Sequence, residues 1–492
     1  MRVSIIGGGI GGMMSALLLN KKGFEVTLFE KEKKLGGRLA YHIHGDYKID
    51  KGPTIVLLPE MLQSLLKEAG VSEEEYELIS CDPLYDLHFA DGTIYTKYRD
   101  KQAQMEEINR VFPGEEAGYL EFMSDMEKRF NEGKPRFLEQ SFLKRWDAIQ
   151  PATLNSLRKL KAFKSVSRQL HNYFQDDRLK TAYALQTLYI GGNPFQTPGI
   201  YSLVSYSEHE HGIYYMKGGY AKLAEVLEKK MIEENIRIVK EANIEKISIA
   251  SGRAEGVLYN SKYEQTDAVV LNGDFPIAEK LINKQGRQYQ PSSGCVLIYI
   301  GADGLYDNRK MHQFYLSENF EKNMNQIFKE RVIPEDPSYY VFNPSIIDET
   351  LAPKGKSALY VLVPVPSEID EDWESVKYSL KEKVLESMER SGFESLRERA
   401  EWIDIRTPEE AKQEGLYTGG SFGIAPALFQ SGPFRPQFQP YPELENVFAT
   451  GASTHPGGGV PIVMQGAKLL ADGMDRKFYR RERSADGTGK SV

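Results

Sequence analysis

Residues 1–30 read MRVSIIGGGIGGMMSALLLNKKGFEVTLFE, and this stretch decides the fold. The β-branched run 3–6 predicts a short strand, and residues 13–22 predict a helix because no breaker interrupts them. Residues 26–29 predict a second strand that ends at Glu30. A strand, a glycine turn, a helix and a strand make a βαβ unit, so we expect an α/β fold with a doubly wound sheet.

The turn contains Gly7, Gly9 and Gly12 in the spacing G-x-G-x-x-G. The first glycine permits a tight turn, the second lets the backbone approach a pyrophosphate, and the third lets the helix pack closely on the strand. The N-terminus of the helix then offers free N–H groups to the phosphate. Glu30 ends the second strand, where its carboxylate would accept hydrogen bonds from ribose hydroxyls. The sequence therefore predicts a dinucleotide site.

Two short motifs follow this unit. Arg38 comes just after it, where a guanidinium can neutralise the phosphates of a dinucleotide. Gly52 and Pro53 precede Thr54, and a Gly-Pro pair lets the backbone pass close to a flat ring. Both motifs therefore extend the predicted site.

A second glycine-rich segment lies near the other end of the chain. Residues 446–461, NVFATGASTHPGGGVP, lead into a helix that we expect to begin near Pro461. The N–H groups at the start of this helix could bind an electron-rich ring edge. Two such sites at opposite ends of one chain predict FAD rather than NAD.

The chain resembles the bacterial phytoene-desaturase-type carotenoid oxidoreductases, most closely their C30 branch, the 4,4'-diapophytoene (dehydrosqualene) desaturases. The resemblance extends to about residue 475. Gly458 departs from it, since the family usually has a small residue with a side chain there. The matching motifs are GGGIGG at 7–12, GGR at 36–38, DKGPT at 50–54, QTLYIGGNPFQTPGIYSL at 186–203, MKGGYAKLAEVL at 216–227, FGIAPALFQSGPFRP at 422–436 and ATGASTHPGGGVPIVMQGAK at 449–468.

This resemblance implies an FAD-dependent enzyme that desaturates a long hydrophobic polyene stepwise, from 4,4'-diapophytoene toward diaponeurosporene or diapolycopene. Taking a hydride from an allylic C–H group needs a flavin held beside the carbon, and no metal or covalent nucleophile. Aromatic faces can stabilise the resulting cation, and the chain has 28 Tyr and 23 Phe. No residue is assigned as the catalytic base. The implied cofactor-binding residues are Gly7, Gly9, Ile10, Gly11, Gly12, Glu30, Gly37, Arg38, Gly52, Pro53, Thr54, Ile244, Gly451, Ala452, Val460 and Pro461.

The same resemblance implies a cytoplasmic protein bound peripherally to the inner face of the cell membrane. Residues 144–168 are the candidate contact, because they hold seven basic residues against one acidic residue, Asp147, on an otherwise acidic chain. Leu154 and Phe163 are interleaved with these charges, as are Leu157 and Leu160. An ordinary solvated helix face is the alternative interpretation.

Length and pattern predict two interleaved domains, an FAD-binding domain and an α+β substrate domain. We expect a strand at 49–58, a hairpin at 85–98 and a helical insertion at 104–185, with helices over 115–130 and 154–174. The expected division is 1–100, 215–275 and 440–475 for the FAD-binding domain, 101–214 and 276–439 for the substrate domain, and 476–492 for a disordered tail.

Composition narrows the partners. The 492 residues have a formal net charge of −8 and a sequence pI near 5.7, so nucleic acid is not an expected partner. Cys81 and Cys295 are the only two cysteines, which predicts neither a disulfide framework nor a zinc cluster and fits a reducing cytoplasm. The sequence assigns no oligomeric state.

Several alternatives share some of these signals. The same fold could oxygenate a terminal methyl group of a diapocarotene, bind prenyl lipids without redox chemistry, or oxidise an amine. The run 419–423 matches the G-x-S-x-G motif of hydrolases, with His455 downstream, but residues 407–415 before it look helical. The pairs His42-x-His44 and His209-x-His211 have metal-compatible spacing, yet strand alternation or a turn explains them, so no metal is expected.

Overall fold

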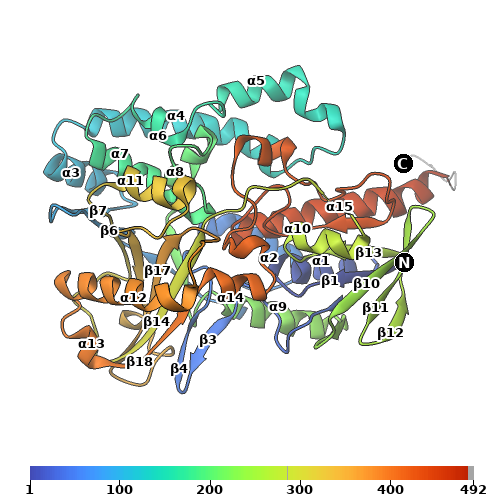
Figure 1. Cartoon of the computed structure of the whole chain (residues 1–492). Helices are drawn as coiled ribbons and strands as arrows, with labels where there is room; N and C mark the ends of the chain where they lie inside the picture. Colours follow the sequence, from blue (N-terminus) through green and yellow to red (C-terminus); the bar gives the residue numbers. More distant parts are fainter. Residues whose placement is uncertain (285, 486–492) are drawn as a thin grey trace.

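The computed structural model describes residues 1–284 and 286–485. A five-stranded parallel sheet contains the N-terminal unit, on the right of Figure 1, and its strand order is β19-β13-β1-β2-β9. The sheet therefore joins segments from both ends of the chain. Its strands are β1 (Arg2–Ile6), β2 (Glu25–Phe29), β9 (Arg237–Val239), β13 (Ala268–Leu271) and β19 (Val447–Ala449).

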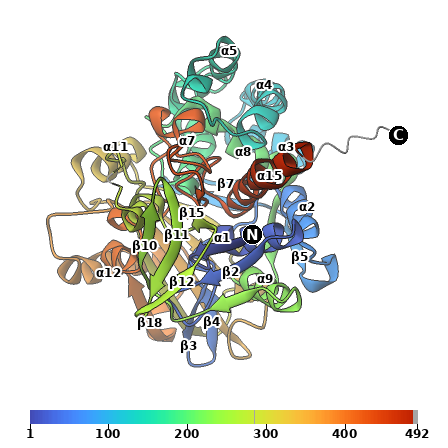
Figure 2. The ribbon, with the colours of Figure 1, turned by 90° about the vertical axis from the view of Figure 1, so that its right-hand side faces the viewer.

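Both faces of this sheet are covered. In β13, Ala268 and Val270 pack with the helices, whereas Val269 and Leu271 pack on the opposite face, as the two-residue period of a strand requires. The helices on the first face are α1 (Ile10–Lys21), α2 (Pro59–Ala69), α9 (Lys222–Glu233) and α15 (Val460–Ala485). The second face carries a three-stranded sheet, visible in Figure 2, and a short helix: β10 (Ile244–Ala250), β11 (Arg253–Tyr259), β12 (Lys262–Gln265) and α10 (Phe275–Ala278).

A second, seven-stranded sheet has the order β18-β14-β17-β16-β15-β6-β7. All its neighbouring strands are antiparallel except β15 and β6. One face packs against α12 (Trp373–Arg390) and α13 (Leu396–Arg399). The strands are β6 (Tyr85–His88), β7 (Ile94–Lys97), β14 (Gly294–Asp303), β15 (His312–Tyr315), β16 (Tyr339–Phe342), β17 (Lys356–Val365) and β18 (Ala400–Arg406).

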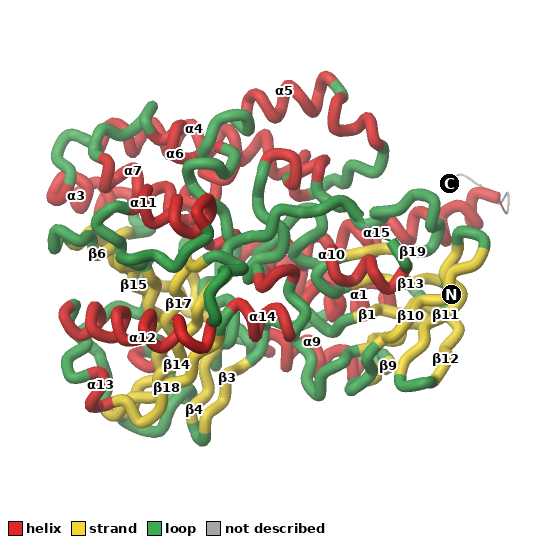
Figure 3. Tube along the Cα trace, in the orientation of Figure 1, coloured by secondary structure: helices red, strands yellow, loops and turns green. Residues whose placement is uncertain are grey.

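Helices form a layer beyond the other face of this sheet, at the top of Figures 1 and 3. The predicted helical insertion is thus confirmed. Two later helices, α8 (Leu203–His211) and α11 (Phe320–Asn325), also belong to this layer. The helices of the insertion are α3 (Lys101–Val111), α4 (Glu116–Gly133), α5 (Pro151–Lys159), α6 (Val166–Leu170) and α7 (Asp177–Ala184). No helix in the described part of the chain is both long enough and apolar enough to cross a membrane.

Two small sheets connect the larger units. One is the hairpin of β3 (Tyr41–His44) and β4 (Tyr47–Asp50). In the other, β5 (Leu78–Cys81) pairs with β8 (Ile213–Met216). The chain thus passes repeatedly between the two main sheets.

The expected fold class, an α/β flavin-binding domain with an interleaved α+β domain, is confirmed, although β10–β12 take the place of helices on one face of the parallel sheet. The strand predicted at 49–58 ends at Asp50, because Gly52 and Pro53 interrupt it, and only Val56 makes a further isolated bridge. The helix predicted at 154–174 is broken, since α5 ends at Lys159 and α6 begins at Val166.

Two predicted boundaries differ from the structure. The hairpin at 85–98 forms, but β6 pairs with β15, so this part of the segment 1–100, expected in the FAD-binding domain, contributes to the seven-stranded sheet. The tail predicted to be disordered is helical over 476–485, because α15 continues there and Phe478 and Tyr479 pack against the helical core. The rest of that prediction, 486–492, lies outside the described residues.

Candidate functional site: a cavity between the two sheets

A cavity of about 1040 Å³ extends from the N-terminal glycine turn into the space between the seven-stranded sheet and the helical layer. Of the cofactor-binding residues expected from the sequence, all except Gly12 line it. The structure therefore brings together residues from both ends of the chain. The lining set is Gly7, Gly9, Ile10, Gly11, Glu30, Gly37, Arg38, Gly52, Pro53, Thr54, Ile244, Gly451, Ala452, Val460 and Pro461.

The glycine turn has the geometry that the spacing predicts. Gly7 has a φ of 103°, a left-handed conformation that glycine adopts readily. A Cβ atom on Gly12 would lie 2.1 Å from the carbonyl oxygen of Gly7, so Gly12 is the residue that lets α1 pack against the turn. Gly9 precedes α1, and no side chain of the described residues caps this helix. The first N–H groups of α1 therefore remain available for an anion.

Glu30 is buried and already bonded on both carboxylate oxygens. Its Oε2 accepts from the N–H of Gly8 at 2.7 Å, and its Oε1 accepts from the N–H of Glu32 at 2.9 Å. These two bonds fix the carboxylate beside the turn. A carboxylate can accept about four hydrogen bonds, so the group retains capacity for ribose hydroxyls.

Arg38 lines the same cavity. Its Nη1 donates to the carbonyl oxygen of Ser421 at 2.7 Å, and desolvation lowers the pKa of the guanidinium while the nearby Asp274 raises it. A guanidinium carries five N–H donors. Most of them are left without a partner in the described chain, which suits a residue that is to bind phosphate.

The C-terminal part of the site depends on Arg435, which sequence reasoning missed. This buried side chain donates to the carbonyl oxygens of Gln430, Ala452 and Thr454 at 2.9, 2.5 and 3.2 Å. It thus ties the segment before it to the turn that contains Gly451. One signal in the sequence could have identified it: Arg435 is the first charged residue after the uncharged run 416–434. An arginine next to a buried segment often donates hydrogen bonds to backbone carbonyl oxygens.

Away from the glycine turn, the cavity is lined mainly by apolar and aromatic side chains. The helical layer supplies Leu188, Tyr189 and Leu203, and the seven-stranded sheet supplies Phe314 and Tyr360. Thus the polar glycine turn and an apolar chamber belong to one continuous space. Such a chamber would exclude water and accept a long hydrocarbon.

The other sequence signals do not form the sites that their spacing suggests. Ser421 follows the short helix η9 (Tyr417–Gly419) instead of a strand, and His455 contacts the carbonyl oxygen of Gln140, so the hydrolase arrangement does not form. His42 and His44 stack on Tyr299 and Trp402, with ring centroids 4.2 and 4.5 Å apart.

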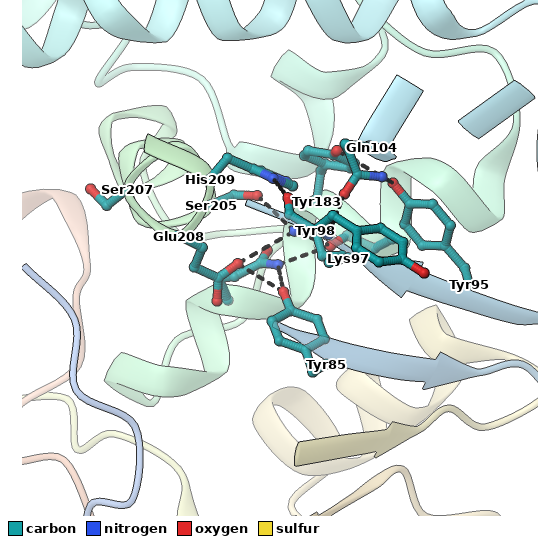
Figure 4. A network of polar contacts seen from close by, with 12 residues as sticks. Tyr85, Tyr95, Lys97, Tyr98, Gln104, Tyr183, Ser205, Ser207, Glu208 and His209 are labelled. Atoms are coloured by element: carbon teal, nitrogen blue, oxygen red, sulfur yellow. Dashed lines mark hydrogen bonds and ion pairs between the residues drawn. The ribbon is translucent and has the colours of Figure 1, made fainter. Parts of the chain in front are cut away.

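Glu208 and His209 belong to a buried polar network around Lys97 (Figure 4). Nζ of Lys97 lies 3.3 Å from Oε2 of Glu208, and His209 contacts the carbonyl oxygen of Tyr98. Among the residues that the structure describes, no three His, Cys, Asp or Glu side chains form a group able to hold a metal ion.

The site fits FAD. The glycine turn is so tight that a Cβ atom at Gly12 would fill it, and no described side chain caps the N-terminus of α1. Arg38 lines the same cavity with most of its donors unused by the described residues. Glu30 and Arg38 would hold the ribose and the phosphates, while Gly52, Pro53 and the turn at Gly451 would border the ring.

Comparison with known proteins gives the same assignment. Residues 10–474 match the family described as flavin containing amine oxidoreductase. The chain is 51% identical over 486 residues to a 4,4'-diapolycopen-4-al dehydrogenase of Metabacillus indicus, which covers 98% of this chain and 99% of the relative. It is 31% identical to a 4,4'-diaponeurosporene-forming 4,4'-diapophytoene desaturase of Staphylococcus haemolyticus, with 96% of this chain and 98% of the relative covered.

Among solved structures, an oxidoreductase from Methanosarcina mazei has the same fold, with a TM-score of 0.64 and 18% identity over 96% of this chain and 100% of the other. The chain therefore belongs to the flavin containing amine oxidoreductases, in their branch of phytoene-desaturase-type carotenoid oxidoreductases, and its cofactor is FAD.

Proposed function

We propose that this protein is an FAD-dependent carotenoid desaturase that removes hydrogen stepwise from a C30 precursor, 4,4'-diapophytoene, to give diaponeurosporene or diapolycopene. One observation carries the proposal: a single cavity joins the expected FAD-binding residues to a chamber lined by leucine, phenylalanine and tyrosine. The relatives named as diapophytoene desaturases support the substrate class.

When bound, FAD supplies the acceptor for a hydride. The chain's own contribution is to hold the polyene against that acceptor and keep water away. Tyr189, Phe314, Tyr340 and Tyr360 place aromatic rings along the chamber, where their faces can stabilise a delocalised cation on the substrate.

A second candidate is oxidation at a terminal carbon of a diapocarotenoid on the same fold. The name of the 51%-identical relative, a diapolycopen-4-al dehydrogenase, favours it. The two candidates differ in their products, because desaturation removes hydrogen whereas terminal oxidation adds oxygen.

The test is to express the protein in a host that supplies 4,4'-diapophytoene and to analyse the extracted pigments by chromatography and mass spectrometry. The expected products are lighter by successive losses of two hydrogen atoms and absorb at longer wavelength. A parallel strain supplies diapolycopene or its aldehyde. Oxygen gain there with an unchanged precursor in the first strain would transfer the assignment to terminal oxidation.

We also propose that residues 144–168 contact the cytoplasmic face of the cell membrane. Leu157 and Leu160 turn inward, but Trp146, Ile149 and Phe163 are 60, 67 and 61% exposed. Leu157 and Ala162 of the same segment line the cavity, so a polyene leaving a bilayer at this surface would be close to the chamber. The surrounding lysines and arginines favour anionic lipids.

The double variant Trp146→Ser/Phe163→Ser is expected to bind vesicles of anionic phospholipid at least about tenfold more weakly, because each large apolar side chain contributes roughly 1.5–3 kcal/mol when it leaves water. Flotation of the holoenzyme with the vesicles measures this. Ile232→Ser is the matched control. Ile232 is 61% exposed and lies on α9, on the opposite side of the molecule from α5 (Figures 1 and 2). Equal losses in both variants would refute the proposed surface.

A further inference from the structure

A chain of polar side chains leads from the cavity wall into the seven-stranded sheet. The hydroxyl of Tyr340 on β16 lies 2.9 Å from Oγ1 of Thr54 and 2.7 Å from Nδ1 of His312 on β15. Nε2 of His312 in turn lies 3.8 Å from Sγ of Cys81. All four residues are buried, and of them only Thr54 and Tyr340 line the cavity. Tyr340 therefore connects the cavity to the imidazole behind it.

The imidazole of His312 and the thiol of Cys81 are both neutral. Burial lowers the pKa of His312 to about 3 and raises the pKa of Cys81 to about 12. A neutral imidazole has one N–H donor and one acceptor nitrogen. With the hydrogen on Nε2, facing Cys81, the Nδ1 atom accepts the phenol hydrogen of Tyr340. The phenol oxygen then still has a lone pair for a second proton.

Tyr340 also has a suitable place in the cavity. Its partner Thr54 directly follows Gly52 and Pro53, the pair expected to border the flat ring of FAD. Four carboxylates of the described residues line the cavity, and each already has a partner. Glu30 holds the glycine turn and Glu414 pairs with Arg406. Asp274 accepts from the N–H of Tyr417 and from the hydroxyl of Ser453, and Glu32 lies beside Lys31. The buried carboxylate of Asp50 accepts from the N–H groups of Tyr220 and Ala221 behind the wall.

We propose that the Tyr340 hydroxyl is the proton acceptor of the desaturation and that His312, acting through it, takes up the hydrogen that Tyr340 releases, an inference that rests on the proposed function. After hydride loss, the C–H bond next to the substrate cation breaks and its electron pair becomes the new C=C bond. The proton goes to the Tyr340 oxygen, whose own hydrogen passes to Nδ1 of His312. A carbon acid beside a cation is strong, so this weakly basic pair is sufficient.

The products of that step are an alkene, a neutral phenol and an imidazolium. Because burial disfavours the imidazolium, its proton returns through Tyr340 to the cavity when the product leaves. No oxidant beyond FAD is needed, since the hydride has already left the substrate.

The experiment uses the FAD-loaded holoenzyme in vesicles that contain 4,4'-diapophytoene, either unlabelled or deuterated at one or the other carbon of the double bond being formed. Tyr340→Phe is expected to retain FAD and lower turnover by about 10²–10⁴-fold, the usual contribution of a general base. The isotope effect at the proton-losing carbon is expected to rise, and that at the hydride-losing carbon to fall, because proton loss becomes rate-limiting.

Tyr95→Phe is the matched control. Tyr95 is buried on β7 of the same sheet and does not line the cavity, and its hydroxyl accepts from Nε2 of Gln104 at 2.8 Å. This variant is expected to keep the turnover and both isotope effects of the wild type. Loss of a buried tyrosine hydroxyl alone is thereby separated from loss of the proton acceptor.

His312→Gln provides a second, independent measurement. The amide can hold the Tyr340 hydroxyl but cannot take its proton, so turnover is expected to fall at least about tenfold with the same change in the isotope effects. Wild-type turnover in either variant, or slow turnover with unchanged isotope effects, would overturn the assignment. If Tyr340→Phe does not fold, His312→Gln decides alone. A wild-type enzyme that does not desaturate this substrate would instead refute the proposed function.

Discussion

Replacing Lys97 with methionine is expected to lower the free energy of unfolding by about 3–5 kcal/mol, the usual cost of leaving one partner of a buried ion pair uncompensated. The side chains of Lys97 and Glu208 are both fully buried, and Nζ lies 3.3 Å from Oε2 (Figure 4). Tyr85 donates to the same carboxylate oxygen at 2.7 Å. Burial lowers the pKa of Lys97 to about 8 and raises that of Glu208. Methionine would fill the space of the lysine but leave the buried carboxylate of Glu208 without an opposite charge.

Urea unfolding of the single variant and of Lys97→Met/Glu208→Gln tests this expectation. The double variant removes both charges, so its free energy of unfolding is expected to lie within about 2 kcal/mol of the wild type. If the double variant were less stable than Lys97→Met, pairing of the two charges would not be the reason for the loss.

The second large effect is expected at Gly12, where alanine should abolish retention of FAD. Its Cβ atom would lie 2.1 Å from the carbonyl oxygen of Gly7 and 2.7 Å from Nδ2 of Asn272. The carbonyl oxygen of Gly7 belongs to the backbone and cannot shift without moving the turn. We therefore expect α1 to move away from the glycine turn, which takes its N–H groups out of the phosphate site. Forced packing of this kind also costs about 1–3 kcal/mol of stability. Absorbance of the purified protein in the flavin bands measures retention.

Gly458→Ala is the comparison for this prediction. Gly458 also lies in a glycine-rich turn, but the nearest atom to its Cβ would be the carbonyl oxygen of Phe422 at 3.6 Å. The family usually has a side chain at this position, so we expect FAD content equal to the wild type. FAD retention by Gly12→Ala, or equal losses in both variants, would contradict the steric explanation.

The local parts of the fold could be predicted from the sequence. β1, α1 and β2 form one contiguous unit, and the glycine spacing specifies their turn. The pairings between distant strands could not, because β19 pairs with β13 and β6 pairs with β15 across long stretches of chain. No local hydrophobic period encodes such pairings. For the same reason, the sequence predicts the hairpin at 85–98 but not its place in the seven-stranded sheet.

The site shows the same division. Glycine, proline and the carboxylate of Glu30 are recognisable because their spacing along the chain reflects their contacts. Tyr340 and His312 meet only through the pairing of β15 and β16, and Lys97 sits at a buried strand position where a charged residue is not expected. Residues that act through contacts between distant segments leave no signature in one sequence.

The order of strands in the parallel sheet also bears on how the protein is made. Synthesis proceeds from the N-terminus, so β1 and β2 are made before β9, β13 and finally β19 and the helix α15 that follows it. β1 and β2 can pair with each other at once, but each must wait for its other neighbour, β13 or β9. A chain that stops before residue 447 lacks β19, so β13 keeps an open strand edge, and the cavity residues Gly451, Val460 and Pro461 are missing.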